Sequence, residues 1–306
     1  MANGEPKVIM WDYNFAPNAQ KSRNYLYAAK IPFQQCDQPF ALPRPILTDL
    51  GITYRRIPVI SIGKDFYCDN SSFLAAGQQI FEKKALRKGK SDSAFEAFGY
   101  RNFWTVLSVV PASLVTEAMK KDRTELFPIF ARDDFASLRP NGLSELRAVL
   151  DVAENEFLGD DGPFIGGEQQ VGMADVHAVW VIKWVLQTLE ISKEKGFGKE
   201  DFPRVYRWIE SFPLHAEQKL DQLSAEDAQK QVLGAEYAAK DIGVGDTDPL
   251  GFKSGDQVSV EPSDAKPHTH PQVGKLVGLS KQETVIQLEN GLRVHFPKVG
   301  YVVSKA

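Results

Sequence analysis

The chain has 306 residues, of which 43% are hydrophobic and 25% charged, and its formal net charge is −4 at pH 7. This length and composition indicate a globular protein of two domains, or of three if one is small, and exclude global disorder. The negative charge and the lack of a long Lys/Arg run give no reason to expect nucleic acid or an anionic membrane as a partner.

The sequence shows no pattern typical of a secreted, membrane-spanning or disulfide-linked protein. The N-terminus lacks the basic segment and apolar run of a secretory signal. The most apolar stretch, residues 176–189, contains His177 and Lys183 and is too short to span a bilayer. Cys36 and Cys68 lie far apart, so neither a disulfide framework nor a cysteine zinc site is predicted. A reducing, cytoplasmic location is expected.

The first 84 residues alternate between strand and helix signals. Short β-forming runs predict strands at 7–11, 33–36, 56–62 and 66–68, and apolar periodicity predicts helices at 19–30, 47–51 and 73–81. Asp69, Asn70 and Ser71 precede the last helix and are good N-cap residues. The order is therefore that of an α/β domain.

The rest of the chain changes period twice. After a polar linker at 83–92, residues 93–220 have a helical pattern, and Asp175 is expected to cap a buried helix at 176–189. Beyond residue 250 the period becomes two, and five strands are predicted at 257–260, 275–279, 283–288, 292–296 and 301–303, with an Asn-Gly turn at 290–291. Such strands fit a small SH3-like barrel. We expect domains at 1–84 (α/β), 92–240 (all-α) and 250–306 (all-β).

Four separate segments of the chain resemble the glutathione transferase superfamily. They are residues 11–23, Arg56-Ile-Pro-Val59 with Asp69-Asn70, the segment from Gly162 to Asp175, and residues 202–208. They look like the family's opening loop, its cis-proline and acidic-pair motif, its helix-capping segment and its last conserved helix. The resemblance covers residues 7–220 and implies a thioredoxin-like α/β domain followed by an all-α helical domain. The segment 250–306 lies outside it and resembles an extension of filamentous-fungal members.

The resemblance also implies a glutathione site. The residues that it assigns to glutathione are Arg56, Ile57, Pro58, Val59, Asp69, Asn70 and Ser71. A cis bond before Pro58 would let the Val59 backbone pair with the cysteinyl part of glutathione. The helix N-terminus at Asp69 and Asn70 would hold the γ-glutamyl group. The alternative is an ordinary trans Pro58 and an Asp69 that only caps its helix. Arg44 and Arg55 lie, like Arg56, where the family often places a cation for the glycine carboxylate, and the alternative is that all three are solvated.

The chain departs from the family at the reacting group. Where the family often has Ser or Cys, this chain has Ala16, which can neither donate a hydrogen bond to a thiolate nor act as a nucleophile. Tyr13, Asn14 and Asn18 remain as catalytic candidates, with solvated loop positions as the alternative. Cys68 is expected to be a buried, inert thiol rather than a reactive one.

Aromatic residues supply the candidate substrate pocket. The resemblance places Phe15, Tyr100, Phe103 and Trp104 beside a hydrophobic substrate, and the alternative is that the last three are plain core. Pro267-His-Thr-His-Pro271 lacks a third ligand at suitable spacing, so no metal site is predicted.

The leading hypothesis is a glutathione-transferase-like transferase or isomerase. It would act on a hydrophobic, electrophilic small molecule by thiol addition or addition–elimination, and the fungal-like tail suggests secondary metabolism. A second hypothesis keeps the fold but uses the pocket for a cofactor-free reaction or ligand carriage, as Ala16 would suggest. A third is a non-catalytic protein-interaction module. A homodimer is one expectation from the family.

Overall fold

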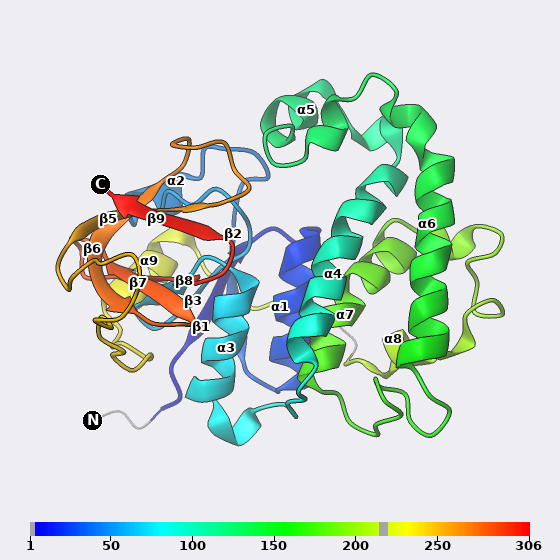
Figure 1. Cartoon of the computed structure of the whole chain (residues 1–306), viewed down its shortest axis with the longest axis horizontal. Coiled ribbons are helices and arrows are strands. Elements are labelled where there is room, and N and C mark those ends of the chain that lie inside the picture. Colours follow the sequence, from blue (N-terminus) through cyan, green and yellow to red (C-terminus); the bar gives the residue numbers. More distant parts are fainter. Residues whose placement is uncertain (1–3, 214–219) are drawn as a thin grey trace. The chain divides into compact units, whose positions relative to one another are not determined.

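A computed structural model describes residues 4–213 and 220–306, which fall into two compact units (Figure 1). The first unit comprises Met1–Ala19, Ile31–Ala85 and Lys219–Ala306, and the second comprises Gln20–Lys30 and Leu86–Gln218. Helix α1 (Pro17–Ala28) begins in the first unit and continues in the second. The division differs from the three expected domains, because the C-terminal strands belong to the same unit as the N-terminal ones.

The N-terminal part of the first unit has the predicted order of elements. Its strands are β1 (Val8–Asp12), β2 (Phe33–Asp37), β3 (Val59–Ile62) and β4 (Asp65–Tyr67), and its helices after α1 are α2 (Pro45–Asp49) and α3 (Asn70–Ile80). Strand β1 pairs parallel with β2 and antiparallel with β3, and β3 pairs antiparallel with β4. All five residues of β1 are buried, as its apolar run predicts.

The five predicted C-terminal strands are also present. They are β5 (Gln257–Pro262), β6 (Gln272–Leu279), β7 (Glu283–Gln287), β8 (Arg293–Pro297) and β9 (Tyr301–Lys305). The turn before β8 contains Gly291 at φ +83°, and Leu292 N–H donates to Asn290 Oδ1 at 3.2 Å. A bulge in β6 between Leu276 and Gly278 interrupts its pairing with β7, and such a bulge bends the strand that contains it.

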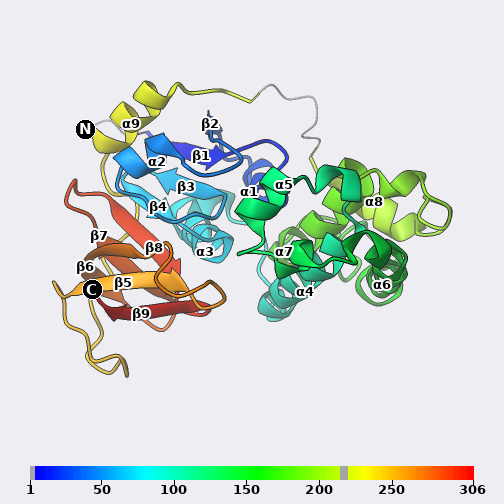
Figure 2. The same cartoon turned by 90° about the horizontal axis from the view of Figure 1, so that it is seen from above.

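The two groups of strands form one sheet. Among the described residues its strand order is β2-β1-β3-β4-β8-β7-β6-β5-β9, which is open, with β2 and β9 at its edges. The junction is a parallel pairing of β4 with β8, in which Phe66 lies opposite Val294 and Tyr67 opposite His295. Figure 2 shows β5–β9 continuing from β3 and β4. The small β region is therefore an extension of the N-terminal sheet.

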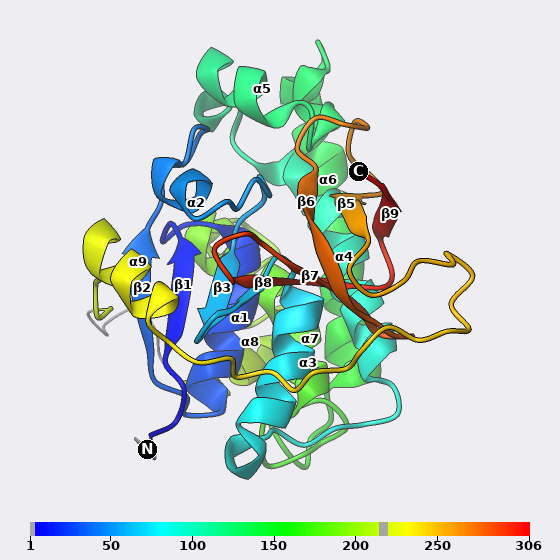
Figure 3. The ribbon, with the colours of Figure 1, turned by 90° about the vertical axis from the view of Figure 1, so that its left-hand side faces the viewer.

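One hydrophobic core cluster of this unit contains side chains from both groups of strands. It contains Trp11 and Phe66 from the N-terminal strands together with Val294 and Phe296 from β8. Helix α9 (Ala225–Leu233), which the sequence assigned to the helical domain, contributes two buried residues to the same core, Ala228 and Val232. Figure 3 shows α9 next to β1 and β2. The segment before α9 is bonded to β2, since Leu223 N–H donates to Gln35 O at 2.8 Å.

The second unit is helical, as predicted. Its main helices besides α1 are α4 (Asp92–Val106), α5 (Glu117–Arg123), α6 (Arg139–Val152), α7 (Met173–Lys183) and α8 (Pro203–Ser211). Short 3-10 or π segments lie at Glu82–Lys84, Leu107–Val109, Ala112–Leu114, Pro128–Ala131, Phe135–Leu138, Ala153–Phe157, Trp184–Thr188 and Ile191–Lys193, the first of them in the first unit. The end of the predicted helical stretch, 214–219, lies outside the described residues. Over the described ranges no helix is both long and apolar enough to cross a membrane.

Asp175 holds the start of α7, which is buried over its first ten residues as predicted. Its Oδ2 accepts a hydrogen bond from Gly172 N–H at 2.8 Å. Its Oδ1 accepts from Ile165 N–H at 2.8 Å and from Trp208 Nε1 at 2.9 Å. The expected structural role of Asp175 is thus confirmed, and burial raises the pKa of its carboxyl to about 6 although these three donors lower it.

Candidate functional site

The N-termini of α1 and α3 meet in the first unit. Asn70 Nδ2 donates a hydrogen bond to the backbone oxygen of Asn18 at 2.9 Å, which joins the first turns of the two helices. Asp69 is the N-cap of α3, as its residue type predicts, and its Oδ1 accepts from Ser71 N–H at 2.8 Å. Two helix N-termini in one place favour an anionic group.

The segment Ile57–Val59 leads into β3. Its Ile57–Pro58 peptide bond is cis. Val59 is buried and lies opposite Trp11 in the β1–β3 register, inside the sheet. Ile57, which precedes the strand, is only half-buried. The part of this segment that is accessible to a ligand therefore centres on Ile57.

The three arginines that the sequence singled out differ in what they contact. Buried Arg44 donates to the backbone oxygens of Pro39 at 3.1 Å and Phe40 at 3.2 Å, and also to that of Arg55, so it fixes the loop before α2. Arg55 is buried. Arg56 is the more exposed cation, and of the three it is the best placed to meet an anion from solvent.

Arg56 forms an ion pair with the C-terminal segment. Its guanidinium lies 2.6 Å from the Oδ1 of Asp264, which is in the loop between β5 and β6. Burial lowers the pKa of Arg56, but Tyr54 and the bond to Asp264 outweigh this and raise it. Because both partners are partly exposed, the pair contributes little to stability.

Asp69 is also bonded to the C-terminal segment. Tyr301 of β9 donates its hydroxyl hydrogen to Asp69 Oδ2 at 3.0 Å. The Tyr301 oxygen lies 3.0 Å from the hydroxyl of Tyr54. Two residues of the predicted glutathione site, Arg56 and Asp69, are therefore contacted by residues more than 200 positions later in the chain.

The opening loop makes a tight turn before α1. Ala16 is only 2% exposed, and its N–H donates to Tyr13 O at 3.1 Å. Asn14 is exposed, while Asn18 lies half-buried in the first turn of α1. The Tyr13 ring packs with Phe15 and Phe40 at centroid distances of 4.7 and 5.4 Å. With 55% of its side chain exposed, Phe15 offers an aromatic surface beside the turn.

Neither cysteine is a reactive thiol. Cys68 follows β4 and is fully buried, and this burial, with Asp69 nearby, raises the pKa of its thiol well above the usual value. Burial likewise raises the pKa of Cys36 to about 11. Both thiols are therefore protonated near neutral pH, in line with the expectation for Cys68.

The remaining pocket candidates lie on α4 of the second unit. Phe103 is 4% exposed and packs against Trp180 at a centroid distance of 5.4 Å, so it belongs to the helical core rather than to an accessible wall. Tyr100 is half-buried beneath the Lys21 ammonium, which lies 4.9 Å from its ring. Trp104, at 44% exposure, is the accessible member.

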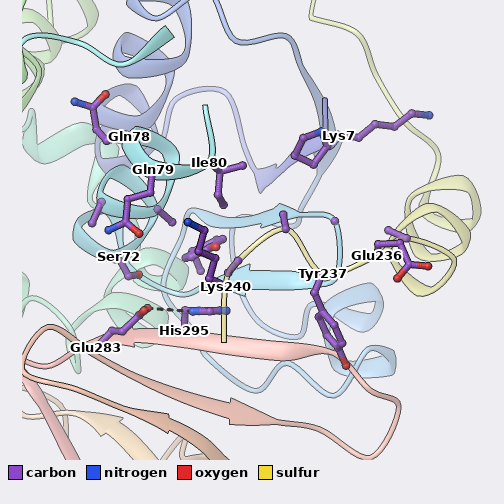
Figure 4. Close-up of a pocket in the computed structure, with 18 of the residues that line it drawn as sticks. Lys7, Ser72, Gln78, Gln79, Ile80, Glu236, Tyr237, Lys240, Glu283 and His295 are labelled. Carbon is purple, nitrogen blue, oxygen red and sulfur yellow. Dashed lines mark hydrogen bonds and ion pairs between the residues drawn. The ribbon is translucent and has the colours of Figure 1, made fainter. Parts of the chain in front are cut away.

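A cavity that the sequence did not predict lies between α3, the segment after α9 and the C-terminal strands (Figure 4). Its volume is about 1200 Å³, and Figure 4 shows Ser72, Gln78 and Gln79 of α3 along it, with His295 and Glu283 on its strand side. His295 Nδ1 lies 3.1 Å from Glu283 Oε2, and its ring stacks on Tyr67. Among the described residues, no group of three or more His, Cys, Asp and Glu side chains is arranged to hold a metal ion.

The structure thus brings the predicted residues of the first unit into one region. Asn18 and Asn70 are in direct contact, and the register of β1 with β3 places Val59 opposite Trp11, two residues before Tyr13. Sequence reasoning missed Tyr301, Tyr54 and Asp264. No local motif marks them, and Tyr301 and Asp264 come to this region only because β4 pairs with β8.

Comparison with known proteins gives one family match and several relatives. A family model described as a domain of unknown function (DUF7962) matches residues 106–219, within the helical unit. A protein of Glycine max named "Probable glutathione S-transferase" is 34% identical over 77 residues, which make up 25% of this chain and 33% of that protein. The chain therefore matches about a third of the length of this curated relative.

Solved structures match over longer ranges. A GST-like protein from Pseudomonas syringae is 23% identical with a TM-score of 0.68, and the match covers 98% of this chain and 100% of that chain. It therefore extends into the C-terminal strands, so such an extension also occurs in a bacterial protein.

Two further structures match the body of the chain. A Tau class glutathione S-transferase from mango, Mangifera indica, is 14% identical with a TM-score of 0.51, and the match covers 70% of this chain and 91% of that one. A glutathione transferase family member from Pseudomonas fluorescens, solved with two glutathione bound, is also 14% identical with a TM-score of 0.51. The match covers 75% of this chain and 95% of that one. These likenesses show that the chain has the glutathione S-transferase fold.

Proposed function

We propose that the protein is a glutathione-dependent enzyme that transfers the thiol of glutathione to a hydrophobic electrophile, or isomerises it by addition–elimination. The observation that carries the proposal is the junction of the α1 and α3 N-termini, where Asn70 bonds to Asn18 and Asp69 caps α3 beside the Ile57–Pro58 segment. The bound glutathione of the P. fluorescens relative supports the same ligand here.

The ligand would lie along these groups as follows. The γ-glutamyl carboxylate meets the N-terminus of α3 at Asn70 and Ser71, and its ammonium group meets Asp69. The cysteinyl backbone pairs with the chain beside Pro58, where half-buried Ile57 is more accessible than Val59. The glycine carboxylate meets Arg56, which exchanges its exposed partner Asp264 for the ligand.

The chemical step needs a thiolate. Thiol deprotonation releases a proton to water, and the sulfur pair then forms a C–S bond with the electrophilic carbon. The displaced electron pair leaves with a leaving group or moves into a conjugated system that water protonates. Tyr13, Asn14 or Asn18 would donate a hydrogen bond to the thiolate, since Ala16 cannot, and the nearby helix N-terminus lowers the thiol pKa.

The second substrate would be apolar. The exposed ring of Phe15, packed with Tyr13 and Phe40, offers an aromatic surface at the turn where the thiol would lie. We propose a cytoplasmic enzyme of secondary metabolism, working as a monomer or as the homodimer common in the superfamily.

A second candidate is the same fold without glutathione. The buried Ala16 favours it, because it removes the usual Ser or Cys from the opening loop. The region at the N-termini of α1 and α3 would then serve a cofactor-free reaction or carry another ligand.

The test is thermal unfolding of the protein with glutathione up to about 10 mM. A ligand that binds only the folded state stabilises it by about 2.7 kcal/mol at 100 times its Kd. The Asp69→Ala variant should lose the glutathione-induced shift. Because this change also removes a helix N-cap, Ser224→Ala at the start of α9 is the matched control: it should lower the midpoint by a similar amount and keep the shift.

Absence of any shift in the wild type would overturn the proposal and favour the second candidate. A shift that survives in Asp69→Ala would mean that glutathione binds elsewhere. With the expected result, a screen of apolar electrophiles that follows thiol loss identifies the second substrate.

A further inference from the structure

The last strand of the chain contacts the proposed glutathione site. Tyr301 is the first residue of β9, and its hydroxyl donates to Asp69 Oδ2 at 3.0 Å. We infer that Tyr301 is a positioning residue of this site, which holds the Asp69 carboxylate so that it recognises the primary amine of the ligand's γ-glutamyl group. The inference rests on the proposed function and adds the C-terminal segment to it as a determinant of specificity.

The direction of the hydrogen bonds follows from the number of protons. Tyr301 has one hydroxyl hydrogen, and an ionised carboxylate can only accept, so that hydrogen goes to Asp69. Tyr54, 3.0 Å away, must then donate to the Tyr301 oxygen. The two phenols form a chain of donors that ends on the carboxylate, and each bond polarises the next.

Tyr301 is held by ring packing more than by its strand. Strand β9 lies at the edge of the sheet, where Tyr301 is opposite Pro262 of β5. Its ring packs against Phe296 at a centroid distance of 5.3 Å and against Tyr54 at 6.5 Å. Both of these rings are buried, so they fix the position of the Tyr301 hydroxyl.

These contacts fix the plane of the Asp69 carboxylate. Oδ1 accepts from Ser71 N–H and Oδ2 accepts from Tyr301, so each oxygen has its own donor. A carboxylate oxygen has a second lone pair, and an ammonium group can therefore bind an oxygen that already accepts one bond. Because the carboxylate is already held in one orientation before the ligand binds, less conformational entropy is lost when the amine binds.

The other contact of the C-terminal segment is different in kind. The pair between Arg56 and Asp264 joins two partly exposed side chains, which a ligand can separate at little cost. Tyr301 is instead anchored among buried rings, and a ligand at Asp69 meets it as part of the site. Positioning is therefore assigned to Tyr301 and not to Asp264.

The test compares Tyr301→Phe, which removes one oxygen and keeps the ring, with Tyr237→Phe. Tyr237 is the matched control, since its hydroxyl donates to Gly291 O in the same unit, away from Asp69. Calorimetric titration is done with glutathione and with glutathione whose γ-glutamyl amine is acetylated. We expect Tyr301→Phe to weaken glutathione binding about 10-fold or more, as for loss of a hydrogen bond to a charged group. Its affinity for the acetylated ligand should equal that of the wild type.

The outcomes separate the inference from the proposed function. If the wild type binds no glutathione, the proposed function fails and the inference fails with it. If the wild type binds but Tyr301→Phe behaves like Tyr237→Phe, the function stands and the inference is wrong. An equal loss for both ligands would make Tyr301 merely structural, and tighter binding would mean that the C-terminal segment competes with the ligand. Both results would overturn the inference.

Discussion

His295 Nε2 lies 3.0 Å from Asp65 Oδ1, so the parallel strands β8 and β4 are joined by side chains as well as by backbone. Both residues are buried. The other Asp65 oxygen accepts from Ala238 N–H at 2.7 Å and Ala239 N–H at 2.9 Å, which ties down the segment after α9. One carboxylate therefore links three parts of the first unit.

This link makes stability depend on pH. Burial lowers the pKa of His295, but its bonds to Asp65 and Glu283 outweigh this and raise the pKa above 6.5. A raised pKa means that the folded state binds the proton more tightly than the unfolded chain. The stabilisation is therefore complete below pH 6.5 and is lost as pH rises through the folded-state value. Denaturant unfolding at several pH values should show this loss in the wild type and not in His295→Gln. Exposed His268→Gln is the control, and a loss that persists in His295→Gln would contradict the assignment.

Truncation of Phe296 should destabilise the whole first unit. Its side chain is buried in the core that also contains Trp11, and Phe→Ala changes in cores cost about 3–5 kcal/mol. Amide hydrogen exchange in β1 and β3 should accelerate together with that in β5–β9. Val273→Ala, at an exposed position of β6, should change neither. Faster exchange confined to β5–β9 would show that the C-terminal strands unfold separately.

In the second unit, Asp175→Asn should lower stability by about 1–3 kcal/mol. Both Asp175 oxygens accept from N–H donors, and an amide NH₂ placed against one of these donors leaves a buried group unpaired. Thermal unfolding measures the change. Asp151→Asn on α6, which is exposed, is the control. An unchanged midpoint for Asp175→Asn would show that these hydrogen bonds make no net contribution to stability.

Removal of the Phe15 ring should affect catalysis and not folding. The side chain is largely exposed, so Phe15→Ala should change stability by less than about 0.5 kcal/mol. We expect kcat/KM for an apolar electrophile to fall several-fold while the Kd of glutathione stays the same. Steady-state kinetics and calorimetry test the two halves. Equal kcat/KM in the variant would remove Phe15 from the substrate surface.

Placing a hydroxyl at position 16 should increase the reactivity of a glutathione thiol bound at the proposed site. If the thiol lies at the start of α1, Ala16→Ser adds a donor to the thiolate, and turnover should rise about tenfold or more. Ultraviolet absorbance of the thiolate against pH should show a lower pKa of bound glutathione. Ala19→Ser, also buried in the first turns of α1, is the control. An unchanged thiol pKa would place the sulfur away from Ala16.

Much of the fold could be predicted because its signals are local. The alternation of β-forming residues predicts β5–β9, and the short polar side chains at 69–72 predict the start of α3, where Asp69 is the N-cap. The apolar stretch that begins at Val176 predicts a buried helix, and the structure has it. Such signals need only the residues of the element itself.

The pairing of β4 with β8 and the contacts that the C-terminal strands make with the candidate site could not be predicted. The contact of Tyr301 with Asp69 joins residues 232 positions apart, and that of His295 with Asp65 joins residues 230 positions apart. Both depend on the parallel alignment of β4 with β8, which neither strand specifies alone. For the same reason the period-two pattern of residues 257–303 predicts a barrel and gives no sign that β8 pairs with β4. The family resemblance places Phe103 in the pocket with plain core as the alternative, and the sequence cannot decide between them because a periodic aromatic looks the same in both. In the structure Phe103 is buried in the core.

The continuous sheet also determines when this protein can finish folding. During synthesis β4 is made early, while its partner β8 follows more than 220 residues later, after the entire helical unit. At about 5–20 residues per second, this delay is on the order of 10 to 50 s. Over that time Phe66 and its neighbours lack the apolar surface that β8 provides, and the β4 edge of the sheet stays open to pairing with other chains.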